Sequence, residues 1–144
     1  MLIFLDIDGV MVPAKGWKKV ELLNDGFPAF SNRATRALQS LISEGVAVIL
    51  TTSHKSNYDI DKWKQIFRNR GINIENLFSL PNNLNNLNRK DEIVNWLSAN
   101  NVGEDFLIID DDKSLNELPF NLKEKLIQPS PTIGLTGDLL QSAS

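Results

Sequence analysis

The sequence contains no cysteine and only one histidine, His54. Without cysteine the chain forms no disulfide bond and no thiolate metal site. A single histidine also excludes a zinc site built from several imidazoles. Any metal chemistry of this chain must therefore rely on oxygen ligands.

Long apolar segments are absent as well. No apolar run approaches the about 20 residues that cross a bilayer, and no basic region followed by a long apolar stretch stands at the amino end. These absences predict a cytoplasmic protein that does not contact membranes. The 144 residues, of which 42% are hydrophobic and 23% charged, favour one soluble domain over residues 1–144 with a substantial core.

The chain has little net charge. It holds 15 lysines and arginines against 18 aspartates and glutamates, which gives a formal charge of −3. This balance disfavours a broad nucleic-acid-binding surface. Lys15, Lys18 and Lys19 are the best candidates for a local basic patch, and a solvated loop is the simpler interpretation of these lysines.

Five carboxylates follow two apolar runs of strand length. They belong to Asp6 and Asp8, after the run 2–5, and to Asp110, Asp111 and Asp112, after the run 106–109. If the two runs are parallel neighbours in a sheet, their carboxyl ends lie side by side, where open α/β sheets bind ligands. Crowded carboxylates need a counter-ion, and a hard divalent cation such as Mg²⁺ takes oxygen ligands. Taken alone, Asp-x-Asp-Gly after an apolar run also marks a simple turn.

Apolar runs alternate along the chain with amphipathic helical segments, a pattern that predicts a parallel sheet with helices on its faces. The expected strands are 2–5, 46–50, 72–77, 106–109 and a weaker one near 126–127. The expected helices begin at Ser31 or Asn32, at Asp59, at Lys90 and at Asp138, and the first three end before Gly45, near Asn69 and near Ala99. An asparagine-rich loop over 81–88 leads into the third helix.

Thr51 and Lys90 are candidate phosphate ligands. Thr51 follows the central strand at the same edge as Asp6 and Asp110, and its hydroxyl can donate a hydrogen bond to a phosphate oxygen. It is also an ordinary strand-ending residue. Lys90 opens a helix, where the helix dipole disfavours a cation, and this position favours a functional reason: a lysine aimed into the acidic crevice would hold a phosphoryl group. Arg89 is its competitor.

The order Asp-x-Asp, Thr, Lys, Asp-Asp, each at the expected end of an element, resembles the haloacid dehalogenase-like (HAD) phosphohydrolase superfamily over essentially the whole chain. The resemblance implies a Rossmann-like three-layer α/β sandwich with a mostly parallel central sheet. It also implies a squiggle and hairpin flap after the first strand, here Val10–Pro13 within a flap region of about residues 10–30. The family works through an aspartyl-phosphate intermediate with Mg²⁺.

The same resemblance implies a role for each matching residue. Asp6 corresponds to the nucleophile, and Asp8 to the general acid that later acts as the base. Phosphate binding falls to Thr51, Thr52 and Lys90, with Lys90 preferred over Arg89; the metal falls to Asp6, Asp8, Asp110 and Asp111. Asp112 is then either a spectator or, in a shifted register, one of the metal acids.

The spacing leaves no room for the cap domain that many members of the superfamily insert, so the resemblance implies an open crevice. An open crevice suits a phosphorylated substrate on a bulky carrier, such as a nucleic-acid end or a protein. Leu5–Val10 and Leu50–Ser53 make the chain similar to small capless members, including the HAD domain of RNA-repair proteins. The alternatives are a non-catalytic binding or regulatory module with this fold and a small-metabolite phosphatase.

Three further features are expected to border the crevice. Gly134-Leu135-Thr136 resembles a closing motif of capless phosphatases and is expected to form a turn beside the active edge. His54 follows the threonine motif and Trp17 lies in the flap. Each either touches substrate or serves the packing of the protein.

Overall fold

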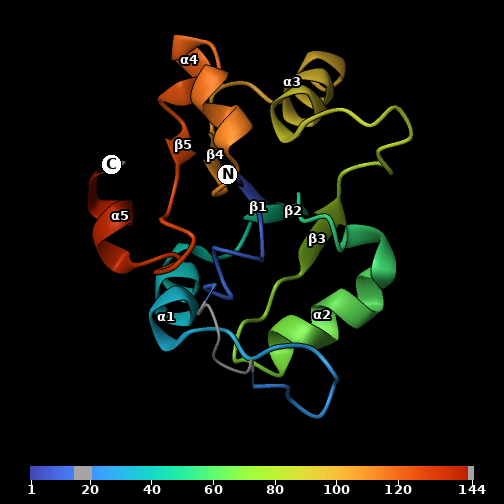
Figure 1. Ribbon diagram of the computed structural model, residues 1–144, viewed down its shortest axis with the longest axis vertical. Coiled ribbons are helices and arrows are strands. Elements are labelled where there is room, and N and C mark those ends of the chain that lie inside the picture. Colours follow the sequence, from blue (N-terminus) through green and yellow to red (C-terminus); the bar gives the residue numbers. More distant parts are fainter. Residues whose placement is uncertain (15–20, 143–144) are drawn as a thin grey trace.

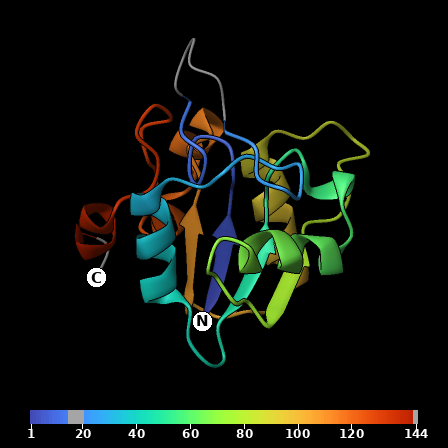
Figure 2. The ribbon, with the colours of Figure 1, turned by 90° about the horizontal axis from the view of Figure 1, so that it is seen from below.

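The computed structural model describes residues 1–14 and 21–142, so the expectations for Lys15, Trp17, Lys18 and Lys19 lie outside the described residues. A five-stranded sheet in the order β3-β2-β1-β4-β5 forms the centre of the fold. The strands are β1 (Leu2–Leu5), β2 (Ala47–Leu50), β3 (Asn76–Ser79), β4 (Phe106–Ile109) and β5 (Leu126–Ile127). All four strand pairs are parallel, and Figure 2 shows the arrows pointing the same way.

Helices cover both faces of the sheet. They are α1 (Asn32–Leu41), α2 (Ile60–Arg68), α3 (Arg89–Ala99), α4 (Phe120–Lys123) and α5 (Gly137–Ser142), with 3₁₀ turns η1 (Lys55–Asn57) and η2 (Lys113–Glu117). In Figure 1, α1 and α2 lie on one side of the sheet and α3 and α4 on the other, and α5 packs against α1. The predicted three-layer α/β sandwich is confirmed.

Each face of the sheet has its own hydrophobic core, because alternate side chains of a strand point to opposite faces. Ile3 and Leu5 of β1 lie in the core beneath α1 and α2, whereas Phe4 lies in the core beneath α3. A strand buried on both faces reads as a continuous apolar run. This is why β1, β2 and β4 were recognisable from the sequence.

Side-chain caps set the starts of the helices. The Ser31 hydroxyl accepts a hydrogen bond from the Ala34 N–H at 3.1 Å, as expected for an N-cap serine. Asn88 caps α3 by accepting from the Asp91 N–H at 2.8 Å. The third helix therefore starts at Arg89, one residue before the predicted start.

The predicted strand over 72–77 is displaced. Ile72 and Ile74 are buried in the core beneath α1 and α2, but β3 begins only at Asn76, which pairs with Ala47. The apolar alternation that suggested a strand reflects the packing of a connecting segment. Because β3 is an edge strand, fewer neighbours fix where its pairing begins.

The carboxyl ends of β1, β2 and β4 meet at one edge of the sheet. Their hydrogen bonds continue one residue beyond each strand: the Asp6 N–H donates to the Ile109 carbonyl at 3.0 Å and the Thr51 N–H to the Leu5 carbonyl at 2.9 Å. These backbone hydrogen bonds hold Asp6, Thr51 and Asp110 next to one another at the edge of the sheet.

The described segments around this edge contain no cap domain. Residues 53–88 are accounted for by η1, α2, β3 and their loops, and the described parts of the connection from β1 to α1 contain only turns and isolated bridges. Among the described residues, no helix combines the length and apolar character needed to cross a membrane.

Candidate active site

Three carboxylates converge where β1 and β4 end. Oxygen atoms of Asp6, Asp110 and Asp111 all lie within 4.8 Å of one another, and we call these three residues the acidic cluster. The register that pairs Leu5 with Ile109 places the residues that follow them side by side. Asp6 and Asp110 are 4% and 0% exposed. The predicted convergence of the two acidic strand ends is present.

Burial and mutual repulsion oppose ionisation of the acidic cluster. Burial is the main cause that raises the pKa of Asp6, and the charge of Asp110 and a hydrogen bond with Asp111 raise it further. Burial likewise raises the pKa of Asp110, although Arg89 and Thr51 oppose that shift. A divalent cation would favour the ionised forms of all three carboxylates. The donor set, oxygen only and partly buried, fits a hard cation such as Mg²⁺.

Arg89 is the cation that reaches the acidic cluster. Its Nη1 donates to Asp110 Oδ2 at 2.6 Å and lies 3.5 Å from Asp6 Oδ1. Burial alone would lower the pKa of Arg89, but the charges of Asp110 and Asp6 outweigh this effect and raise it. The Thr51 hydroxyl donates to the same Asp110 oxygen at 2.8 Å. Thr51 and Arg89 thus hold Asp110 from two elements.

The expected placement of Lys90 in the crevice is wrong. Its Nζ lies 3.9 Å from carboxylate oxygens of Asp91 and of Glu117, away from the acidic cluster. Because α3 starts at Arg89, that residue occupies the first helical position and points to the sheet edge, and the next residue is turned by about 100° around the helix. The adjacent Arg89 was the correct choice for the crevice.

Arg89 forms a further ion pair with Glu92. Arg89 Nε lies 3.9 Å from Glu92 Oε1, one turn further along α3. The other oxygen of Glu92 is 3.2 Å from Nζ of Lys55, whose side chain is only 7% exposed. The i, i+3 spacing of Arg89 and Glu92 is a signal in the sequence that would have favoured Arg89 over Lys90.

Asp8 lies outside the acidic cluster. Its carboxylate is largely exposed and contacts the ring of His54, with Oδ2 and Nε2 2.6 Å apart. The other ring nitrogen, Nδ1, is 3.2 Å from the Asn57 side-chain nitrogen. Because an amide nitrogen only donates, Nδ1 accepts and Nε2 donates to Asp8. The structure therefore does not place the Asp8 carboxylate with the other metal candidates, and it gives His54 a partner at the crevice.

Thr52 and Asp112 stabilise local turns. Thr52 follows Thr51 in the chain, and Asp112 follows Asp111. The Thr52 hydroxyl accepts from the His54 N–H at 3.2 Å and so shapes the turn after β2. Asp112 accepts from the Ser114 N–H at 2.9 Å and caps η2. Asp112 is thus the acid of the triple that lies outside the acidic cluster.

Gly9 makes room for Asp111. Its φ of +78° belongs to the left-handed region, and a Cβ at this position would lie 2.1 Å from Asp111 Oδ2. A side chain here would therefore strain the backbone and displace a cluster carboxylate. The glycine of Asp-x-Asp-Gly is required by the site as well as by the turn.

The segment with the expected closing motif packs on the squiggle. The Leu135 N–H donates to the Val10 carbonyl at 2.8 Å, and Leu135 is fully buried. A Cβ on Gly134 would meet the same carbonyl oxygen at 2.6 Å. The carboxyl-terminal part of the chain thereby supports the turn that follows Asp6 and Asp8.

An ion pair that the sequence did not predict holds the flap region near His54. Arg70 follows α2 and binds both carboxylate oxygens of Asp25, at 2.6 and 3.1 Å. Its guanidinium also donates to the carbonyls of Phe27 and Pro28. The Phe27 ring in turn packs edge-on against the His54 ring, 6.5 Å between centroids. No periodic pattern in a sequence reveals a contact between residues this far apart.

Comparison with known proteins agrees with this arrangement. The family model described as the HAD domain in Swiss Army Knife RNA repair proteins matches residues 2–139. The chain belongs to this family. The match of the HAD domain runs from β1 into α5 and includes the acidic cluster and Arg89. Membership indicates phosphohydrolase-type function, and the acidic cluster of this HAD domain is a candidate metal site. A search of curated protein sequences returned no match to the chain.

Proposed function

We propose that this HAD domain is a Mg²⁺-dependent phosphatase that hydrolyses a phosphate monoester through an aspartyl-phosphate intermediate. The acidic cluster carries the proposal. It gathers three carboxylates at the carboxyl edge of a parallel sheet, where only Arg89 reaches them with positive charge among the described residues. Mg²⁺, when bound by Asp6, Asp110 and Asp111, would offset the repulsion between a dianionic phosphate and an attacking carboxylate.

Asp6 serves as the nucleophile of the first half-reaction, and Asp8 transfers a proton in both half-reactions. Asp6 attacks phosphorus and forms the acyl phosphate, while Asp8 gives its proton to the departing alkoxide. In the second half-reaction Asp8 takes a proton from water as that water attacks phosphorus, which releases inorganic phosphate and restores Asp6. The hydrogen bond from His54 keeps the Asp8 carboxylate at the mouth of the site.

We assign phosphate binding to Thr51 and Arg89 and not to Lys90. Arg89→Met is expected to lower kcat/KM for a generic aryl phosphate by about 10²–10³-fold, because a charged donor at the developing negative charge is lost. Lys90→Met is the matched control and is expected to change kcat/KM by less than about fivefold, since its ion pairs are at the surface. Arg89→Lys separates charge from guanidinium geometry. The opposite ranking of the Arg89 and Lys90 variants would contradict the assignment.

The open edge favours a bulky substrate. No cap domain covers the acidic cluster in the described part of the chain, so a small metabolite would lack the lid that excludes water and provides specificity. The family description names RNA repair proteins, which supports a nucleic-acid end as the carrier of the phosphate. The presence of both Asp6 and Asp8 argues against a non-catalytic binding module.

The decisive experiment measures phosphate release from a panel of monoesters with and without Mg²⁺. The panel contains sugar phosphates, a phosphoserine peptide and oligonucleotides phosphorylated at the 5′ or the 3′ end. We expect turnover that needs Mg²⁺, stops with a chelator and is fastest for an oligonucleotide. Preference for a sugar phosphate would refute the open-site assignment. Absence of turnover for every ester with Mg²⁺ would favour the binding module.

A further inference from the structure

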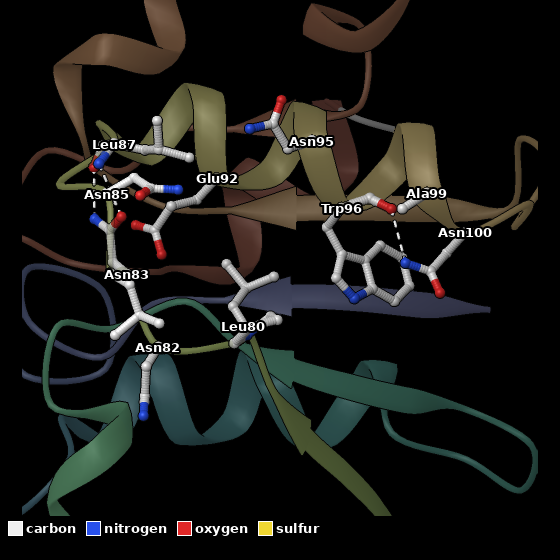
Figure 3. A pocket seen from close by; sticks show the side chains of 12 residues that line it. Leu80, Asn82, Asn83, Asn85, Leu87, Glu92, Asn95, Trp96, Ala99 and Asn100 are labelled. Carbon is white, nitrogen blue, oxygen red and sulfur yellow. Dashed lines mark hydrogen bonds between the residues drawn. The ribbon is translucent and has the colours of Figure 1, made fainter.

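A groove leads from Arg89 away from the acidic cluster. Its far part is a cavity of about 540 Å³ between the loop after β3 and one side of α3, shown in Figure 3. Its near part is a cavity of about 240 Å³ that reaches Ser53 and Arg89. The two cavities share the lining residues Asn82, Asn83, Leu84 and Glu92. The two cavities therefore adjoin, and together we call them the asparagine groove, which extends from Arg89 to Trp96.

The asparagine groove is uncharged at its far end. Leu84 and Trp96 provide apolar surface there, and Figure 3 shows asparagines on both the loop and α3. Among the described residues, Glu92 is the only charged residue that lines the far cavity, and its carboxylate is paired with Lys55 at 3.2 Å. A phosphodiester backbone or an acidic peptide would find no cation among the described residues that line this cavity.

Three carboxamides of the groove are free to bind a ligand. Within the described residues, the side chains of Asn82, Asn85 and Asn95 make no hydrogen bond, whereas Asn83 binds the backbone of Leu87 through both its nitrogen and its oxygen, at 2.6 and 2.8 Å. Asn83 thus closes the loop and fixes its shape, and the other carboxamides remain available. A preformed cavity of this kind reduces the ordering that a ligand must impose.

We infer that the asparagine groove binds the nucleobase beside the terminal phosphate of a nucleic-acid end, an inference that rests on the proposed phosphatase function. A nucleobase is neutral and flat, with apolar faces and an edge of donors and acceptors. Its faces match the apolar surface of Leu84 and Trp96. Its edge matches carboxamides, which pair with base edges through one donor and one acceptor. The base lies away from the reacting phosphorus, and its binding energy would raise the rate of turnover at a site that no described segment covers as a lid.

The test compares binding of two ligands that differ only in the base. The probes are a phosphorylated trinucleotide and its counterpart that lacks the terminal base, each labelled at the end opposite the phosphate and followed by fluorescence anisotropy. We expect the protein to bind the complete trinucleotide about tenfold more tightly. The double variant Asn82→Ala/Asn95→Ala should lose this tenfold difference. Both positions are exposed, so the fold is not at risk.

Asn116→Ala/Asn121→Ala is the matched control, because both asparagines are exposed and lie outside the groove. This control should keep the full preference for the base. Equal affinity of the unmodified protein for the two probes would overturn the inference, as would a phosphoserine peptide that competes better than the trinucleotide and depends on Asn82 and Asn95.

Binding and turnover separate the two proposals. The anisotropy measurement needs no catalysis, so a preference for the base without any phosphate release would support the groove and refute the phosphatase. Release of phosphate from an aryl ester with no preference for the base would support the phosphatase and refute the groove. In the groove variants, kcat/KM for the aryl ester is expected to stay within about twofold of the unmodified protein, since that ester has no base to bind.

Discussion

Asp6→Asn is expected to abolish phosphate release, with kcat lowered by at least about 10⁴-fold. A carboxamide is a far weaker nucleophile than a carboxylate, and it also contributes no negative charge to a bound cation. The measurement is the rate of inorganic phosphate release from an aryl phosphate at saturating Mg²⁺. Trapping of a phosphorylated protein in the unmodified enzyme, and its absence in the variant, would identify the residue that carries the phosphoryl group.

The same substitution is expected to leave the metal-free fold intact or slightly more stable. Burial and the charge of Asp110 raise the pKa of Asp6, so a neutral side chain of the same size removes a repulsion from the acidic cluster. Asp112→Asn is the matched control, because Asp112 caps η2 outside the cluster. It should keep activity and nearly unchanged stability, because asparagine caps a helix about as well as aspartate. Turnover of Asp6→Asn at the unmodified rate would refute the nucleophile assignment.

The sequence was sufficient for the fold and for the convergence of the acids because both depend on simple backbone rules. Parallel strands buried on both faces are continuous apolar runs, and the residues that follow them share one edge. Asp6 and Asp110 were therefore predictable as neighbours before any distance was known. The start of β3 was not, because apolar residues of a connecting segment can be buried without pairing.

The differences between the expected and the observed positions of site residues arise from single-residue geometry. Whether Arg89 or Lys90 enters the crevice depends on which residue begins α3, and the Asn88 cap decides this. Whether Asp8 joins the acidic cluster depends on the turn after β1 and on a histidine 46 residues away in the chain. Composition and periodicity describe faces and elements, but they do not give the direction of one side chain at the end of an element.

Loss of the buried ion pair Asp25–Arg70 is expected to lower the stability of the protein strongly. The two side chains are only 1% and 3% exposed, and the guanidinium is satisfied by the Asp25 carboxylate and by backbone carbonyls. Removing one partner of such a pair leaves the other charge buried without compensation. Asp25→Asn is therefore expected to lower the free energy of unfolding by about 3 kcal/mol at pH 7, measured by urea denaturation.

Glu117→Gln is the control for that measurement. Glu117 pairs with Lys90 at 3.9 Å, and its side chain is 77% exposed. Because solvent and salt screen an exposed pair, its loss should cost less than about 1 kcal/mol. Equal effects of Asp25→Asn and Glu117→Gln would mean that the buried pair has no special role in holding the flap region.

The pH dependence of the Asp25→Asn effect identifies the charge as its cause. Hydrogen bonds from Arg70 hold the pKa of Asp25 well below its ordinary range in the folded protein. An aspartate in the unfolded chain titrates near pH 3.9, so the folded state binds the proton less readily than the unfolded state. The contribution of Asp25 is therefore complete above about pH 5 and is lost as the pH falls through the folded pKa. The difference in unfolding free energy between the unmodified protein and Asp25→Asn should shrink steadily below about pH 4. A difference that stays constant down to pH values near 2 would show that shape, and not charge, accounts for the stabilisation.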